Sequence, residues 1–191
     1  MAHRGLARAE KKARREHREL VCVDESGFYL LPAIVKTYAP RGDTPVLRVY
    51  QTRDHLSVMS GITLAGKLYT LVREEALTSC ERVSFLNHLR HWVSDRLLVI
   101  WDGSPIHRGA EVKMFLAEGG AKHIHLEHLP PYAPDLNPDE GVWDLLKCVE
   151  MCNLCCLDLN HLHSELDLAL GRLRKKPHLI RSCFDEAGLA I

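Results

Sequence analysis

The chain has 191 residues, of which 46% are hydrophobic and 26% are charged, as in one ordinary globular domain. No apolar run approaches the roughly 20 residues that span a bilayer, and the charged N-terminus lacks the apolar stretch of a secretory signal. Membrane and secreted proteins are therefore excluded. Seven cysteines, an odd number without the spacing of a disulfide framework, favour a reducing cytoplasm.

The net charge is zero, but it is unevenly distributed. Residues 1–20 carry seven basic and three acidic side chains, which leaves the rest of the chain with a net charge of −4. Residues 1–19 are predicted to form a basic helical arm or linker with little apolar face, ahead of a domain over 20–191. Such an arm can contact nucleic acid, and a solvated helical lead-in explains the composition equally well.

The first part of the domain is β-rich. The apolar run "LVCV" at 20–23 stops at Asp24 and predicts a buried strand. Three further β-prone segments, separated by Gly and Pro turns, lie at 46–52, 56–64 and 67–72. Their spacing predicts an antiparallel meander.

The second part alternates helices with strands. Thr78 and Glu81 form a capping box for a helix with apolar residues at helical intervals. The elements expected next are a strand at 97–101, a helix over about 108–118, a strand at 124–129, a helix from about Pro138 with Trp143 and Leu146 on its packed face, and a helix from about Leu159 to Arg174. This order predicts an α/β fold with a mixed sheet covered by helices.

Two carboxylates follow apolar strands and precede small turn residues: Asp24 and Asp102. Carboxylates in this position of an α/β sheet face the crevice where ligands bind. Glu140 is the third candidate. Asn137 and Pro138 make Glu140 equally suitable as the last member of a helix capping box, and the spacing alone leaves both roles open.

Four sequence blocks carry a family resemblance: "VCVDESGFYLLP", "YAPRGDTPVLR", "VIWDGSPIH" and "LPPYAPDLNPDEGVWDLLK". They resemble, in order, the blocks of the bacterial insertion-sequence-630 transposases, relatives of the mariner-type DDE enzymes, and the match covers nearly the whole chain from about residue 19. The resemblance implies an RNase H-like (ribonuclease H/integrase-type) fold. It also places Asp24, Asp102 and Glu140 at the family's three catalytic, metal-binding positions and matches His107 to a histidine that follows the second aspartate.

The chain departs from the family pattern in three respects. Gly103 stands where asparagine usually follows the second aspartate, and the 37 residues between Asp102 and Glu140 slightly exceed the usual interval. The N-terminal helix-turn-helix DNA-reading module is absent from this sequence, and a separate or frameshifted upstream reading frame can encode it.

The resemblance also implies the reaction. Two Mg²⁺ or Mn²⁺ ions held by carboxylates activate water and stabilise the leaving oxygen in phosphodiester cleavage, with Asp102 as the bridging ligand. The enzyme cuts DNA at transposon ends, and the 3′-hydroxyl then attacks target DNA. Two transposon ends must be brought together, which implies a homodimer. The resemblance also implies a bacterial cytoplasmic protein that is associated with the nucleoid when it binds DNA.

Other residues are weaker candidates for DNA contact. Arg41 and Lys147 can reach phosphates, as can His107. Tyr132 can stack on a base or cover the core, and the sequence does not rank these two roles.

Two further clusters have a metal-binding and a structural interpretation. Cys148, Cys152, Cys155 and Cys156 lack the paired spacing of zinc knuckles, so buried cysteines at a helical junction are expected instead. The segment His123–His128 carries a His-x-His pair that can bind a transition metal, and a polar, solvent-facing strand side is the favoured interpretation.

Two alternatives to the transposase remain open. One is an inactive or truncated remnant that binds at most DNA or a partner protein, which the missing DNA-reading module favours. The other is a cellular RNase H-like nuclease, in which the "PYAPDLNP" block has no evident role. The three intact carboxylates favour the active enzyme.

Overall fold

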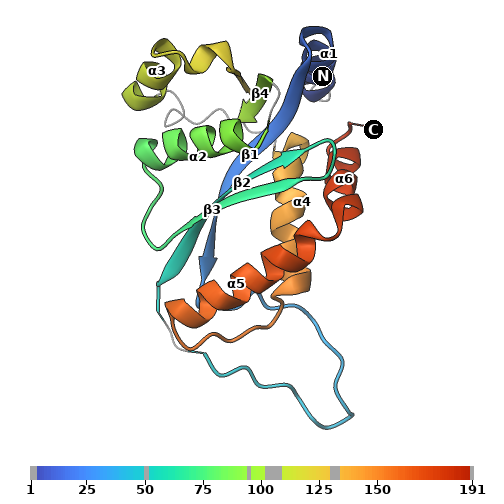
Figure 1. The fold of residues 1–191 in the computed structure, drawn as a ribbon. Helices are drawn as coiled ribbons and strands as arrows, with labels where there is room; N and C mark the ends of the chain where they lie inside the picture. Colours follow the sequence, from blue (N-terminus) through green and yellow to red (C-terminus); the bar gives the residue numbers. More distant parts are fainter. Residues whose placement is uncertain (1–3, 50–51, 94–95, 102–108, 130–133, 190–191) are drawn as a thin grey trace.

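A computed structural model describes residues 4–49, 52–93, 96–101, 109–129 and 134–189. Its centre is a five-stranded sheet flanked by helices (Figure 1). The strands are β1 (Arg18–Tyr29), β2 (His55–Thr63), β3 (Leu68–Arg73), β4 (Arg96–Trp101) and β5 (Ile124–His128). The helices are α1 (Arg4–Glu16), α2 (Ser79–Trp92), α3 (Ala110–Ala117), α4 (Pro138–Asp144), α5 (Leu159–Arg174) and α6 (Pro177–Glu186), with a π-helical segment, Leu145–Glu150, continuing α4.

The strand order is β3-β2-β1-β4-β5. The long β1 is central, since it pairs antiparallel with β2 and parallel with β4. The sheet therefore has an antiparallel half and a parallel half, because β3 is antiparallel to β2 and β5 is parallel to β4. The predicted mixed sheet is confirmed.

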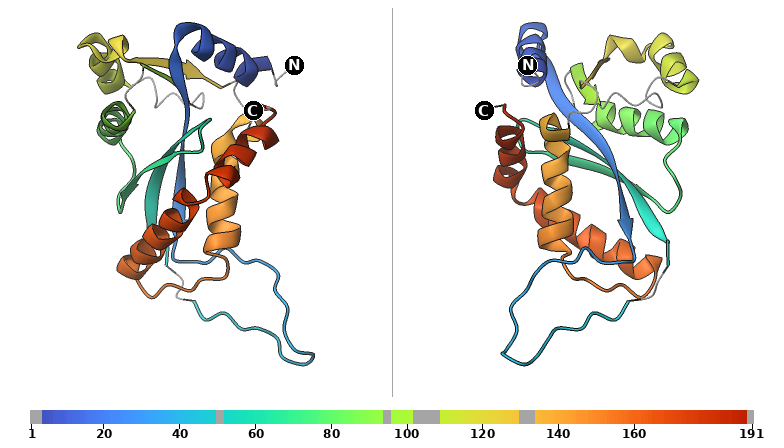
Figure 2. Two further views of the ribbon diagram at one scale, coloured as in Figure 1. Left: turned by 45° about the vertical axis from the view of Figure 1, so that its right-hand side comes forward. Right: turned by 180° about the vertical axis from the view of Figure 1, so that it is seen from behind.

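Side chains of β1 alternate between two separate cores. Leu20 and Cys22 belong to the larger cluster, beneath α1, α4, α5 and α6. Val21 and Val23 belong to the smaller cluster, beneath α2 and α3. Figure 2 shows α4, α5 and α6 together on one side of the strands and α2 and α3 on the other. Alternate residues of one strand therefore serve two cores, as a pleated strand requires.

Local sequence signals set several boundaries as predicted. Thr78 and Glu81 form the expected capping box at the start of α2. Asn137 caps α4 by accepting a hydrogen bond from the amide of Asp139, with Pro138 in the first turn. α5 spans the predicted residues and buries the predicted apolar face. Each of the two caps involves residues at most three positions apart, so it needs no distant part of the chain.

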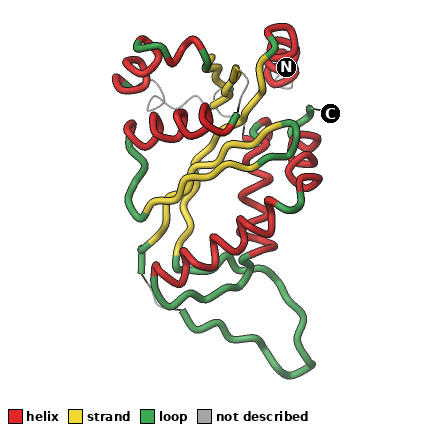
Figure 3. The backbone as a smooth tube through the Cα atoms, in the orientation of Figure 1, coloured by secondary structure: helices red, strands yellow, loops and turns green. Residues whose placement is uncertain are grey.

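The prediction of a strand at 46–52 is wrong for the residues that are described. Residues 46–49 and 52 form no strand, and the described part of the connection between β1 and β2 is a loop that projects from the body (Figure 3). Val46 is 78% exposed and Tyr38 fully exposed. β-propensity stabilises a strand only through neighbours on the sheet, and this segment pairs with none.

The expected N-terminal helix is present as α1, but its apolar face is more extensive than the prediction of little apolar face allowed. Leu6, Ala9 and Ala13 are buried in the larger core. Alanine is too small to signal an apolar stripe by itself, yet it allows the helix to approach the sheet closely. α6 was not predicted. None of the described helices is long and apolar enough to cross a membrane.

Candidate active site

Asp24 lies in the middle of β1, on the side facing α4. The prediction that the strand stops at Asp24 is wrong, because the residues that follow it continue β1 to Tyr29 by pairing with β2. Its side chain is half-buried, and its Oδ2 accepts a hydrogen bond of 2.9 Å from the indole Nε1 of Trp143 on α4. Across the antiparallel pair, Asp24 stands opposite Ser60 of β2. On the other side, Val23, the residue before Asp24, is the parallel partner of Trp101, the last residue of β4.

Asp102, which follows Trp101 in the sequence, lies outside the described residues. The same holds for His107 and Tyr132. Asp24 and Glu140 are the two members of the predicted carboxylate set that the structure describes.

Glu140 lies in the first turn of α4, a helix that contacts both β1 and β2. Trp143 and Leu146 are buried as predicted, while Glu140 and Asp144 are exposed. The backbone amide of Glu140 donates to the carbonyl of Asn137 at 3.1 Å. The cap itself is the Asn137 side chain, which accepts from the amide of Asp139, and the Glu140 carboxylate is presented at the surface.

Asp139 is a buried carboxyl that the sequence analysis missed. It is 0% exposed, and its Oδ1 accepts a hydrogen bond from the hydroxyl of Ser60, while its Oδ2 is buried with no hydrogen-bond partner. Burial, and then the charges of Asp24 and Glu140, raise the pKa of Asp139 well above its usual range against the opposing effect of the Ser60 hydrogen bond. Burial and the neighbouring charges therefore favour the protonated form of Asp139. Its sequence position beside Glu140 gave no signal of burial.

These charges provide a test of whether a divalent cation fits the site. Asp24 and Glu140 both act on Asp139 strongly enough to disfavour its ionised form, so negative charge is concentrated around the first turn of α4. Hard carboxylate oxygens are the ligands that Mg²⁺ prefers. Within the described ranges no three such side chains meet as a metal-binding group, and Asp102 lies outside those ranges. The donor type and the local charge fit a divalent ion.

The two basic candidates have different environments. Lys147, in the π-helical segment, donates to the Ser26 hydroxyl at 2.7 Å and lies 5.2 Å from the centre of the Phe28 ring. It is half-buried against β1, so it is less available to DNA than the prediction assumed. Arg41 is exposed in the turn of the projecting loop.

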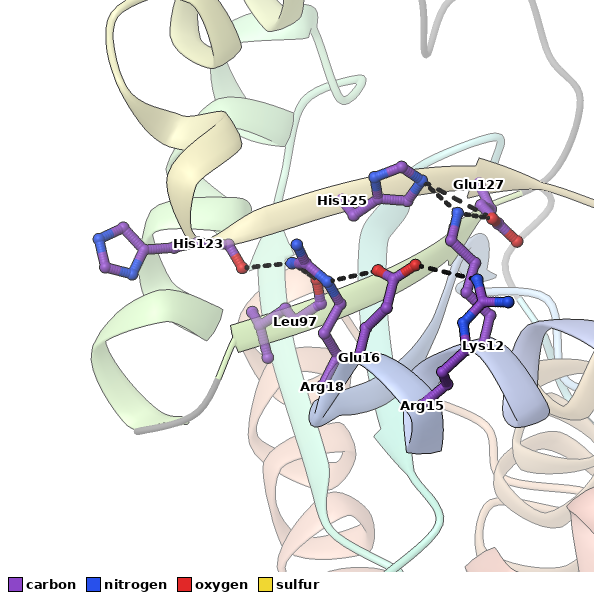
Figure 4. A network of polar contacts seen from close by, with 8 residues as sticks. All are labelled: Lys12, Arg15, Glu16, Arg18, Leu97, His123, His125 and Glu127. Carbon is purple, nitrogen blue, oxygen red and sulfur yellow. Dashed lines mark hydrogen bonds and ion pairs between the residues drawn. The ribbon is translucent and has the colours of Figure 1, made fainter.

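The two clusters with a metal-binding interpretation form no metal group among the described residues. Figure 4 shows that His125 and Glu127 of β5 instead contact Lys12 of α1. In the same network Arg18 donates to the backbone carbonyls of Leu97 and His123. The polar side of β5 thus helps to hold α1. The prediction that the four clustered cysteines are buried is wrong for three of them, because Cys148 and Cys152 are exposed, Cys155 is half-buried and only Cys156 is buried.

Comparison with known proteins places this arrangement in a family. The sequence matches the DDE superfamily endonucleases over residues 19–149. The fold is similar to the mariner Mos1 paired end complex with Mg, with a TM-score of 0.63 and 18% identity over 98% of this chain and 62% of that chain.

Two more solved structures show the same fold. The catalytic domain of Mos1 mariner transposase matches with a TM-score of 0.54 and 14% identity, over 100% of this chain and 93% of that domain. A simian T-cell lymphotropic virus intasome matches with a TM-score of 0.54 and 15% identity, over 80% of this chain and 47% of that chain. No curated protein sequence matches. The chain has the RNase H-like fold and spans 62% of the length of the Mos1 chains in the paired end complexes.

Proposed function

The chain belongs to the DDE superfamily endonucleases, and we propose that it cleaves DNA with a divalent metal ion held by Asp24, Asp102 and Glu140. One observation carries the assignment: Val23 and Trp101 are register partners on neighbouring parallel strands, and each is followed in the sequence by one of the two aspartates. α4 packs on β1 and supplies the third carboxylate.

The roles of the chain's own residues follow from their positions. Asp24 is a half-buried ligand whose carboxylate is held by a hydrogen bond from Trp143, whereas the exposed Glu140 approaches from a helix. Mg²⁺ or Mn²⁺, when bound, supplies a nucleophilic water and stabilises the leaving oxygen. Because its protonated form is favoured, Asp139 adds less negative charge around the two ligands than an ordinary aspartate would.

The wider reaction is proposed from likeness. Matched Mos1 structures are described as a pre-cleavage transpososome and a strand transfer complex. We infer that this chain cleaves transposon ends and transfers the 3′-hydroxyl to target DNA. A pair of metal ions, a homodimer and a separate helix-turn-helix module belong to the same proposal, as does membership of the insertion-sequence-630 group.

We also propose that the basic arm of the sequence analysis, folded as α1, contacts DNA phosphates through its outer side. Arg8, Lys11 and Arg15 are exposed there, opposite the buried Leu6, Ala9 and Ala13. Arg8 and Lys11 make no ion pair within the described part of the chain. Lys12, by contrast, is paired with Glu127.

Metal-dependent nicking of a supercoiled plasmid tests the catalytic assignment. The wild type is expected to nick the plasmid with Mg²⁺ or Mn²⁺. The nicking rate is expected to fall more than about a hundredfold in each of the variants Asp24→Asn, Asp102→Asn and Glu140→Gln. This loss is larger than the one that follows when a metal ligand loses only its hydrogen-bond partner. Asp144→Asn, exposed on the same helix, is the matched control and retains activity. A wild type that does not nick overturns the proposal and favours the inactive remnant.

The salt dependence of DNA binding tests the proposed contact surface on α1. Each lost phosphate contact lowers the slope of log K against log salt by about 0.9. The triple variant R8Q/K11Q/R15Q is expected to show this decrease. The exposed set R90Q/K113Q/K175Q removes the same charge elsewhere and leaves the slope unchanged. Equal slopes for the two triple variants contradict a DNA-contacting α1.

A further inference from the structure

Two side chains one helical turn apart hold α4 and its π-helical continuation against β1. Trp143 donates to Asp24 and packs edge-on against Phe28, with the ring centres 6.0 Å apart. Lys147 donates to Ser26 and lies over the same phenyl ring. Three alternate residues on one side of β1 are therefore contacted from one helical segment, which fixes how that segment sits on the strand.

The contact between Trp143 and Asp24 is the one that reaches the proposed metal site. The indole is only 3% exposed, and a buried indole N–H requires an acceptor. Here the acceptor is a carboxylate oxygen 2.9 Å away. Hydrogen bonds to ionised groups are stronger than neutral ones, so this bond restricts rotation of the Asp24 carboxylate.

Trp143 also follows Glu140 by three residues on the same helix. A helix that is rigid over one turn fixes the start of one side chain relative to the other. The hydrogen bond to Asp24 therefore sets the position of the Glu140 backbone relative to β1. A single side chain connects two of the three proposed ligands.

We propose that Trp143 is a positioning residue for the metal site: its indole N–H orients the Asp24 carboxylate and sets the helix that carries Glu140 against it. The inference rests on the proposed function, because it concerns two of the proposed ligands, Asp24 and Glu140. Ligating carboxylates are commonly held by outer-shell hydrogen bonds, and losing such a partner lowers metal affinity or activity about 10- to 100-fold.

The variant that isolates the hydrogen bond is Trp143→Phe, which keeps an aromatic ring beside Phe28 but removes the donor. The matched control is Phe28→Leu, which disturbs the same ring contact and keeps the indole N–H. If Trp143→Phe does not fold, 3-benzothienylalanine at position 143 replaces the N–H by sulfur at nearly constant shape. Circular dichroism establishes that each variant is folded.

Calorimetric titration with Mn²⁺ gives a readout that does not depend on catalysis. The dissociation constant of the wild type is expected to rise about 10- to 100-fold in Trp143→Phe and to stay unchanged in Phe28→Leu. The Mg²⁺ concentration for half-maximal plasmid nicking is expected to shift in the same direction. Asp24→Asn serves as the reference for a lost ligand.

Each other outcome overturns a specific statement. Wild-type Mn²⁺ affinity in Trp143→Phe makes Trp143 a core residue only. Equal weakening in Phe28→Leu assigns the effect to ring packing and overturns the role of the hydrogen bond. A wild type that binds no Mn²⁺ overturns the proposed metal site itself, and with it this inference. A wild type that binds Mn²⁺ without nicking DNA counts against catalysis and leaves the positioning role to be decided by the variants.

Discussion

The two sides of the sheet are built differently. The side covered by α2 and α3 is closed by an apolar cluster that includes Val21, Phe85 and Trp101, with one ion pair, Glu25 with Arg82, on this side. The side covered by α4, α5 and α6 has the larger apolar core, but it also contains a buried carboxyl, Asp139, with one oxygen that lacks a partner.

The two sides of the sheet therefore contribute differently, one mainly to stability and the other also to the proposed chemistry. Apolar burial on the α2 side stabilises the fold, and no carboxyl oxygen of the described residues there is buried without a partner. On the α4 side, burial of Asp139 between the charges of Asp24 and Glu140 costs stability, and it occurs where the proposed ligands lie. Truncating a buried side chain on the α2 side should therefore destabilise the fold, whereas replacing the buried Asp139 carboxyl should stabilise it.

The largest effect is expected from Phe85→Ala on the α2 side. Phe85 is fully buried, and its ring would lie 3.2 Å from a Cβ on Gly61, which indicates tight packing. The free energy of unfolding should fall by about 3–5 kcal/mol, measured by urea denaturation. A loss below about 1 kcal/mol would show that this side of the sheet is less important for stability than its packing indicates.

A smaller loss is expected from Arg82→Leu, also on the α2 side. The Arg82 guanidinium is buried and donates to both oxygens of Glu25, at 2.7 and 2.8 Å. Since Glu25 keeps some access to water, we expect a cost of about 2 kcal/mol. A double-mutant cycle with Glu25→Gln isolates the pair. A coupling energy of zero would contradict a stabilising ion pair.

On the α4 side, Asp139→Asn is expected to stabilise the protein at pH 7, by about 1–2 kcal/mol. The native state keeps the Asp139 proton above the ordinary pKa of 3.8, whereas the unfolded state releases it there. The wild type therefore loses stability relative to the variant as pH rises from about 4. Thermal unfolding between pH 4 and pH 7 without metal measures this difference.

Asp135→Asn, an exposed change in the preceding turn, is the matched control for Asp139→Asn and should show no such pH dependence. A stability difference between wild type and Asp139→Asn that is constant or shrinks with rising pH would argue that Asp139 is ionised in the folded protein.

The smallest effect is expected at the far end of the same helical segment. Hydrogen bonds from Arg172 and Lys176 lower the pKa of Glu150 below its ordinary value of 4.5. Glu150→Gln should cost about 0.5–1 kcal/mol at pH 7, because both bases are partly exposed and screened. The cost should disappear as pH falls below 4.5 through the native pKa. A cost that persists at low pH would indicate lost packing instead of lost charge.

The sequence by itself determined the elements whose signals are local. The capping residues of α2 and α4, the apolar residues 20–23 in the first half of β1, and the helical spacing of Trp143 and Leu146 all act within a few residues. The family blocks added the order of the candidate ligands. These features could be predicted because neighbouring residues decide them.

Only the tertiary structure decided the contacts made across the sheet. In the folded chain the indole of Trp143 donates a hydrogen bond to Asp24, 119 residues away, and the ammonium of Lys147 donates one to Ser26, 121 residues away. It also buried Asp139 beside Ser60, and it left residues 46–49 without a partner strand. Such outcomes depend on strand register and on how a helix docks, which combine residues far apart in the chain, so no local pattern encodes them.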